Sequence, residues 1–293
     1  MNFCEKRKTF CKRRHHTQLT EQELSTMKRY VMTKKYAHVS ISSLHLLAQR
    51  KGKLFCSLDT WYKYVRIFEW KRPWQKSKKY RAYSGIKTKQ INEIWHIDVT
   101  VVKVRPDIKL YIQAVIDNYS RYVLAWRVTK EINAENTVTT LKLAKQNAAK
   151  IVKQSVKPTV MMDPGTENAN FRVLNFLSSK NLSRLLAQVD VRYSNSMIES
   201  LFRMFKNNYF YHQRIDGIDD LVRKAYFYFT QHNNFIPLAV HQGGRPCEIY
   251  TSTWNHDARN RLDKQKLDAK DERKKRNLSP ACVSCPIPPH RGP

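Results

Sequence analysis

Glu93-Ile94-Trp95-His96-Ile97-Asp98-Val99-Thr100-Val101 is the stretch from which the rest of the chain can be interpreted. Apolar residues alternate with polar ones along it, and this two-residue period is typical of a β-strand. Asp98 lies within the strand, where burial of an unpartnered carboxylate would be costly. The pattern therefore predicts a strand whose acid is held by a metal ion or by a polar partner.

The segments that follow predict a mixed sheet. Residues 110–116 and 121–128 are rich in β-formers and flank the turn residues 117–120, which predicts an antiparallel meander of three strands. Helices are then expected at residues 133–153, 171–179, 196–209 and 218–232, with short strands at 159–162 and 185–189. Three hairpin strands followed by alternating helices and strands predict an α/β fold.

Before this region, residues 18–70 predict three helices. Thr20 and Glu23 form a capping-box pattern, a second helix is expected over residues 40–50, and Ser57 is the expected cap of a third. The turn at residues 51–53 contains a glycine, which makes a helix-turn-helix DNA-binding domain our interpretation. Thr60, Lys63 and Arg66 would then form the DNA-facing side of the third helix, although a plain structural bundle has the same pattern.

Charge points to an anionic partner, because 54 Lys and Arg face only 24 Asp and Glu, a net charge of +30. Residues 1–17 are expected to be a basic disordered arm. Residues 71–91 contain no acid, so we interpret them as a basic linker along DNA phosphates, the alternative being a solvated linker. Its proposed contacts are Lys71, Arg72, Lys78 and Lys79. Residues 253–293 predict an exposed charged helix and a disordered Pro-rich tail.

Compartment and metal content are less strongly indicated. No apolar run approaches the roughly 18–20 residues that span a bilayer, and the N-terminal residues lack the apolar segment of a secretory signal. An intracellular protein without membrane contact is expected. The six cysteines are irregularly spaced, which favours reduced thiols. Cys282 and Cys285 alone are a weak zinc signal, because structural zinc usually has four ligands.

Two further acids stand in settings like that of Asp98. Asp163 follows a predicted buried strand and precedes a glycine turn, and Glu199 lies in the first turn of a predicted helix, with 35 residues between them (164–198). Three carboxylates on separate elements can hold two Mg²⁺ ions for displacement at phosphorus. Favourable charge at a helix start explains Glu199 equally well. Lys206 shares the helix face of Glu199, and Arg203 and Lys206 are candidate phosphate contacts.

A resemblance strengthens the metal-site interpretation. Four stretches carry it, in order: residues 92–100, 114–121, 163–168 and 194–200. They resemble the integrase-core transposases of bacterial insertion sequences, which are relatives of retroviral integrase in the DDE superfamily. The similarity covers roughly residues 92–250, and the preceding helices are similar to that family's N-terminal DNA-binding region.

The resemblance implies an RNase H-like catalytic core, placed here at residues 92–252. It implies that Asp98 contacts both of two Mg²⁺ (or Mn²⁺) ions, that Asp163 ligates one and that Glu199 ligates the other. It further implies cleavage at the ends of a mobile element and transfer of the 3′-hydroxyls into target DNA. The expected partners are double-stranded DNA and further copies of the chain, in the bacterial cytoplasm at the nucleoid, and whether a helper protein takes part is left open.

Two residues depart from the family pattern. Pro164 stands where relatives commonly have Gly or another small or polar residue, and Leu238 stands where they usually have His. Neither is a metal ligand. Two alternatives therefore stay open: a domesticated, non-catalytic DNA-binding protein, and a simple nuclease of the same fold.

Three other residues near the motifs are interpreted as structural. His96 shares a strand face with Asp98 and could touch substrate, but a structural histidine is the favoured interpretation. Asp117 is expected to cap the turn after its strand, and Glu167 to support the site or the local structure.

Overall fold

The computed structural model describes residues 15–72, 86–104, 108–165, 168–187 and 195–278. Most of the predicted arm, Lys78, Lys79, Glu167, Cys282, Cys285 and the Pro-rich tail lie outside these ranges. None of the helices in the described ranges is both long and apolar enough to cross a bilayer.

Three helices form the N-terminal unit: α1 (Glu21–Met32), α2 (Ile41–Arg50) and α3 (Leu58–Ile67), with the short helix η2 (Lys34–Tyr36) after α1. The side chains of Thr20, Ser40 and Ser57 each accept a backbone N–H at the start of their helix, as expected for N-caps. Met27, Leu44 and Trp61 are fully buried where the helices meet. Gly52 turns the chain after α2 with φ of +63°, a conformation that favours glycine.

Five strands form one sheet in the order β3-β2-β1-β4-β5. The first three, β1 (Ile94–Lys103), β2 (Lys109–Asp117) and β3 (Val123–Thr129), are antiparallel, as predicted. Strands β4 (Thr159–Met162) and β5 (Ser183–Leu186) run parallel to β1. This mixed order is the RNase H-like arrangement, so the expected fold class is confirmed.

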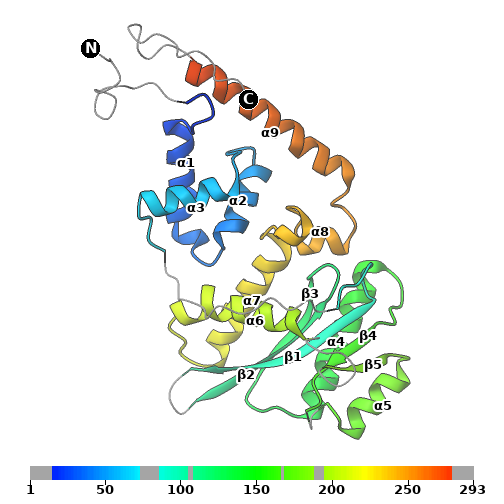
Figure 1. The fold of residues 1–293 in the computed structure, drawn as a ribbon. Coiled ribbons are helices and arrows are strands. Elements are labelled where there is room, and N and C mark those ends of the chain that lie inside the picture. Colours follow the sequence, from blue (N-terminus) through cyan, green and yellow to red (C-terminus); the bar gives the residue numbers. More distant parts are fainter. Residues whose placement is uncertain (1–14, 73–85, 105–107, 166–167, 188–194, 279–293) are drawn as a thin grey trace, which may run out of the picture.

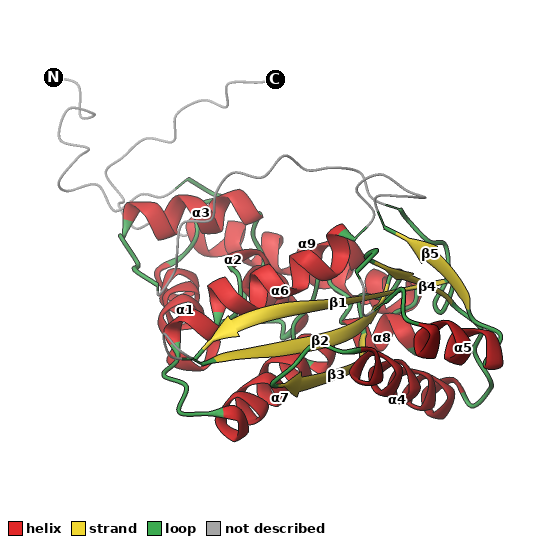
Figure 2. Cartoon of the chain, turned by 90° about the horizontal axis from the view of Figure 1, so that it is seen from below, coloured by secondary structure: helices red, strands yellow, loops and turns green. Residues whose placement is uncertain are grey.

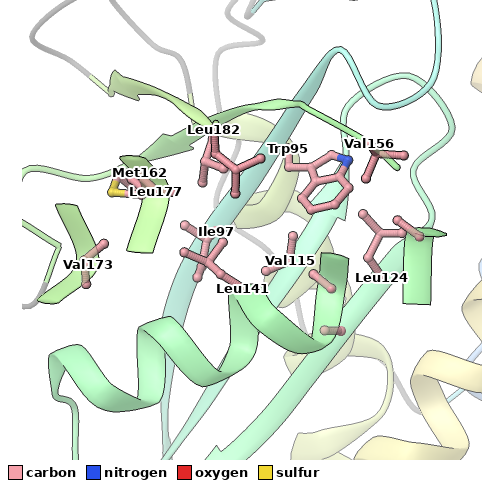
Figure 3. Packing of buried hydrophobic residues seen from close by; sticks show 14 of the residues in the cluster. Trp95, Ile97, Val115, Leu124, Leu141, Val156, Met162, Val173, Leu177 and Leu182 are labelled. Carbon is pink, nitrogen blue, oxygen red and sulfur yellow. The ribbon is translucent and has the colours of Figure 1, made fainter. Parts of the chain in front are cut away.

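Helices cover both faces of the sheet (Figure 2). Against one face pack α4 (Ala134–Val152) and α5 (Phe171–Ser179), where Trp95, Ile97 and Leu141 are buried (Figure 3). Against the other face pack α6 (Ser196–Asn208), η3 (Phe210–His212) and α7 (Ile218–Asn234). Phe205 of α6 and Ile112 of β2 are buried in this second core. The alternation in β1 therefore separates two cores rather than a core from solvent.

The helical unit is docked on the C-terminal side of the core. Ile236 is buried within the helical unit's apolar cluster, and Phe235 and Leu238 pack against it. Leu238 thus makes an apolar contact between the two units. The helices η4 (Ala239–His241) and α8 (Pro246–Tyr250) follow.

A polar contact reinforces this docking. Arg50 on α2 donates to Glu248 Oε1 at 2.6 Å and to the Gly243 carbonyl at 2.9 Å. Its guanidinium also lies 4.4 Å from the ring centroid of Trp254. The charge of Arg50 is therefore satisfied between the two units.

The last helix, α9 (His256–Leu278), is not simply exposed, so that expectation is wrong for one of its faces. Arg273 is only 8% exposed and donates to the Glu23 carboxylate at 2.6 Å and to the Phe55 carbonyl at 2.5 Å. Leu262 is also buried. Helix α9 therefore returns to the N-terminal unit, beside which it runs in Figure 1.

Candidate active site

The register of β1 and β4 places the first two acids side by side. The parallel pairing ends with His96 opposite Met161, and two residues further along each strand are Asp98 and Asp163. Residues level with each other on parallel strands point to the same face. Asp163 directly follows the end of β4, where the carboxyl ends of strands often hold ligands. Asp98 and Asp163 are both half-buried and share the sheet face beneath α6.

A short turn holds the backbone behind Asp163. The amide of Asn168 donates from Nδ2 to the Asp163 carbonyl at 3.0 Å, and its backbone N–H donates to the Gly165 carbonyl at 3.0 Å. Asn168 is buried, whereas Pro164 is exposed. The fixed φ of proline is therefore accommodated in a turn that is stabilised by its other residues.

Asn195 connects the start of α6 to the strands. Its side chain is 2% exposed, and its Nδ2 donates to Asp163 Oδ1 at 2.8 Å. Its Oδ1 lies 3.1 Å from His96 Nδ1, and its backbone carbonyl accepts the N–H of Glu199 at 3.3 Å. One residue thus contacts one predicted ligand through its side chain and a second through its backbone.

His96 is a buried structural residue rather than a surface that substrate could touch. It is fully buried, and its Nε2 accepts from Asn118 Nδ2 at 2.7 Å. Burial lowers the pKa of His96 to about 4, against the opposing effect of its bond to Asn195. The imidazole is therefore neutral, with its proton on Nδ1 facing Asn195.

Helix α6 presents the remaining predicted residues. Glu199, Arg203 and Lys206 are spaced so that they share one helix face. Glu199 and Arg203 are exposed, and Arg203 contacts Ser200 Oγ at 3.2 Å. Lys206 is half-buried beside Asp98: burial lowers the pKa of its ammonium, and the Asp98 carboxylate opposes that change. Lys206 is thus placed next to the Asp98 carboxylate.

The three predicted ligands stand on three separate elements, which are β1, the end of β4 and α6. Asp98 and Asp163 are level on neighbouring strands, and α6 is tied to them by Asn195. Within the described ranges no group of three His, Cys, Asp or Glu residues lies close enough to hold a metal ion jointly. Carboxylate oxygens are nevertheless the donors that Mg²⁺ and Mn²⁺ prefer. Because the bond from Asn195 engages only Oδ1 of Asp163, the donor chemistry fits a hard divalent cation.

Asp117 has the structural role expected of it. Its Oδ2 accepts from the Ser120 backbone N–H at 2.8 Å and from Ser120 Oγ at 2.6 Å, and its Oδ1 accepts from the Asn92 N–H at 2.7 Å. Burial raises the pKa of Asp117, and these hydrogen bonds partly offset the rise. The prediction that Asp117 caps the turn is confirmed.

The predicted DNA contacts of the helical unit differ in their surroundings. Lys63 and Arg66 are exposed on α3, and Thr60 is half-buried with its hydroxyl 2.9 Å from Ser57 Oγ. Lys71 is exposed. Arg72 instead donates to the carbonyls of Tyr36, Ala37 and Val39 at 2.6, 3.1 and 2.8 Å. Arg72 is therefore half-buried, and its guanidinium is bonded to the helical unit.

Reasoning from sequence missed three asparagines: Asn118, Asn168 and Asn195. All three stand inside the motif stretches and are buried. Their position beside the acids was the available signal, but a buried amide looks like turn chemistry until its partners are known.

Comparisons of the sequence with known proteins found one family and one relative. Residues 88–190 match the integrase core domain family. An uncharacterized transposase-like protein of Haemophilus influenzae is 24% identical over 193 residues, which are 61% of this chain and 87% of that protein.

Solved structures of integrases are also similar. The magnesium-bound catalytic core domain of HTLV-2 integrase, in its dimeric form, is 16% identical with a TM-score of 0.41, covering 58% of this chain and 99% of that one. A simian T-cell lymphotropic virus intasome structure is 13% identical with a TM-score of 0.44, covering 75% and 74%. Residues 88–190, which match the integrase core domain family, include the five strands of the mixed sheet.

Proposed function

We propose that this protein is a DNA transposase that cuts at the ends of a mobile element and transfers the resulting 3′-hydroxyls into target DNA. The single observation that carries the proposal is the level placement of Asp98 and Asp163 beneath α6 in an integrase core domain. Two carboxylates that share one face of the sheet on neighbouring strands are suited to divalent-ion chemistry on a polyphosphate. Double-stranded DNA is the proposed substrate, and two element ends require at least two copies of the chain.

Asp98, Asp163 and Glu199 are the residues that would hold two Mg²⁺ ions. Such ions, when bound, neutralise charge on the attacked phosphate and activate the attacking oxygen. The protein's own contribution is positional: β1 and β4 fix the two aspartates, and Asn195 fixes the start of the helix that carries Glu199.

Cationic side chains would orient the DNA. Lys206 lies beside Asp98, and Arg203 is one turn away on the same helix. Both can contact phosphate oxygens next to the bond that is cut. Lys63 and Arg66 on α3 are the proposed contacts of the helix-turn-helix unit with duplex DNA.

The test is Asp163→Ala, assayed with Mg²⁺ on duplexes that contain the DNA flanking the gene on either side. We expect loss of strand cleavage and strand joining with nearly unchanged duplex binding, because the variant removes a ligand and leaves the basic surfaces intact. Asp216→Ala is the matched control, since Asp216 is exposed and pairs with Arg214. It should cleave like the wild type.

Undiminished cleavage by Asp163→Ala would contradict the assignment. A wild-type protein that binds duplexes but neither cuts nor joins them would indicate the non-catalytic alternative. Cleavage without joining to a second DNA would indicate the nuclease.

A further inference from the structure

A continuous chain of hydrogen bonds runs from the interdomain linker to Asp163. It begins at Thr88, whose backbone N–H and hydroxyl donate to Asn118 Oδ1 at 3.2 and 3.0 Å. Asn118 Nδ2 donates to His96 Nε2 at 2.7 Å, and His96 Nδ1 lies 3.1 Å from Asn195 Oδ1. Asn195 Nδ2 then donates to Asp163 Oδ1 at 2.8 Å. The path joins the linker, β2, β1, the start of α6 and the end of β4.

The direction of every bond in this chain follows from its first member. A backbone N–H can only donate, so the Asn118 atom that faces Thr88 must be the amide oxygen. The Asn118 nitrogen therefore faces the other way, where it donates to the Ile86 carbonyl at 3.1 Å and to His96. His96 accepts at Nε2, which leaves its proton on Nδ1, and Asn195 must accept that proton through Oδ1.

The consequence falls on Asp163. With its oxygen turned toward His96, Asn195 presents its NH₂ group to the carboxylate. If the chain ran the other way, Asn195 would present an oxygen, which repels a carboxylate. Asn118, His96 and Asn195 are all buried, with exposures of 1%, 0% and 2%, so water does not offer an easy substitute partner.

We propose that Asn118, His96 and Asn195 are positioning residues that transmit docking of the linker at Thr88 to the Asp163 carboxylate and to the first turn of α6. Contact between the helical unit and the core would thereby influence the acid on which cleavage depends. The inference rests on the proposed function only where it treats Asp163 as a metal ligand.

The first test measures Mn²⁺ affinity of the full-length protein without DNA, by electron paramagnetic resonance of the free ion. His96→Leu should weaken Mn²⁺ binding by about 10- to 100-fold, the usual effect of removing a group that orients a metal ligand. His96→Gln should restore most of the affinity, because glutamine can accept from Asn118 and donate to Asn195.

Gln113→Leu is the matched control. Gln113 is equally buried and bonds Thr137 and Thr140, but it faces α4 on the other side of the sheet. The Gln113→Leu variant loses a comparable number of buried hydrogen bonds and should still bind Mn²⁺ like the wild type. Wild-type affinity in His96→Leu, equal losses in the Leu and Gln variants, or an equal loss in Gln113→Leu would each overturn the proposal.

The second test needs no change in the sheet. Long-range ¹H–¹⁵N spectra should show His96 with its proton on Nδ1, and a proton on Nε2 would overturn the proposal. Thr88→Pro, which removes the N–H that holds Asn118, should weaken Mn²⁺ binding, whereas Thr88→Val, which keeps it, should not. Unchanged Mn²⁺ affinity in Thr88→Pro would show that Thr88 has no part in the hydrogen-bond chain.

The two proposals can fail separately. A wild-type protein that binds no Mn²⁺ would contradict the metal-dependent function. The His96 tautomer would still test the chain of hydrogen bonds from Thr88 to Asp163.

Discussion

At Gly244 the space for a side chain is already occupied. A Cβ atom there would lie 2.6 Å from Trp254 Cδ1 and 2.9 Å from Ile249 Cδ1, closer than carbon atoms approach. Trp254 also stacks on Arg50, which joins the helical unit to the core. Glycine is therefore required at this position because any side chain would clash with Trp254 and Ile249.

We expect Gly244→Ala to lower the free energy of unfolding by about 1–3 kcal/mol, the usual cost of overpacking. Urea denaturation followed by circular dichroism measures it. Gly217→Ala is the control, because a Cβ there meets no atom within 4 Å and the backbone is extended. Equal stability of the two variants would contradict the clash.

His232 makes folding sensitive to acid. It is almost fully buried and donates from Nε2 to the Arg121 carbonyl at 2.9 Å, and burial lowers its pKa to about 4 from 6.5. Because the unfolded chain takes up the proton first as pH falls, stability is constant above pH 6.5 and declines from there toward pH 4.

We expect His232→Gln to lose less stability than the wild type over that interval, by about 1.4 kcal/mol per pH unit. Denaturation midpoints at pH 7, 6 and 5 measure the slope. The exposed His256, replaced by Gln, is the control and should leave the slope unchanged. Parallel slopes for His232→Gln and the wild type would contradict the assignment.

Asn195 shows the limit of prediction at single positions. The acid at residue 163 could be recognised from its neighbours in the chain, since a strand end and a glycine turn are local features. The partners of Asn195 lie 32 and 99 residues away, and only the folded sheet brings them together. Local pattern locates a functional residue more readily than the residues that orient it.

Elements were predicted well where their signals are local. Hydroxyl caps at Thr20, Ser40 and Ser57 start helices at the expected residues, and alternation located β1. Helix α9 was predicted as a helix, but not its docking. Charged residues surround it on all sides, so no apolar stripe marks the buried face, and Arg273 is recognisable only through Glu23, 250 residues away.

Arg273→Ala should detach α9 from the helical unit and cost about 2–3 kcal/mol of stability. The reason is that Glu23 and the Phe55 carbonyl would lose a charged, buried donor. Hydrogen exchange in α1 and α9 measures the detachment. Lys274→Ala, in which an exposed pair with Asp271 on the same helix is lost, should cost less than about 1 kcal/mol. Unchanged exchange in Arg273→Ala would show that other contacts hold α9.

At the scale of the whole molecule, the net charge of +30 means that many Lys and Arg side chains have no acid within the protein to pair with. Glu23, Asp117 and Glu248 already bond to groups within the protein. The surplus cations are available for phosphates, and displacement of counterions then makes binding depend on salt.

Affinity for duplex DNA should fall linearly with the logarithm of salt concentration, with a slope of about −0.9 for each phosphate contacted. Fluorescence anisotropy at 50–200 mM salt measures it. Lys63→Ala with Arg66→Ala should make the slope shallower by about two contacts. Lys274→Ala, whose side chain pairs with Asp271 on α9, should leave it unchanged. A flat response in the wild type would assign the charge to a different partner.

The bonds between α9 and the N-terminal unit also set an order of events during synthesis. Asn277 donates to the carbonyls of His15, His16 and Gln18, and Arg273 completes the surroundings of Glu23. Residues 15–23 thus wait for residues 273–277 to be synthesised before all of their contacts can form. A polypeptide that stops before α9 would lack these contacts, so its N-terminal helices would be more open to proteases.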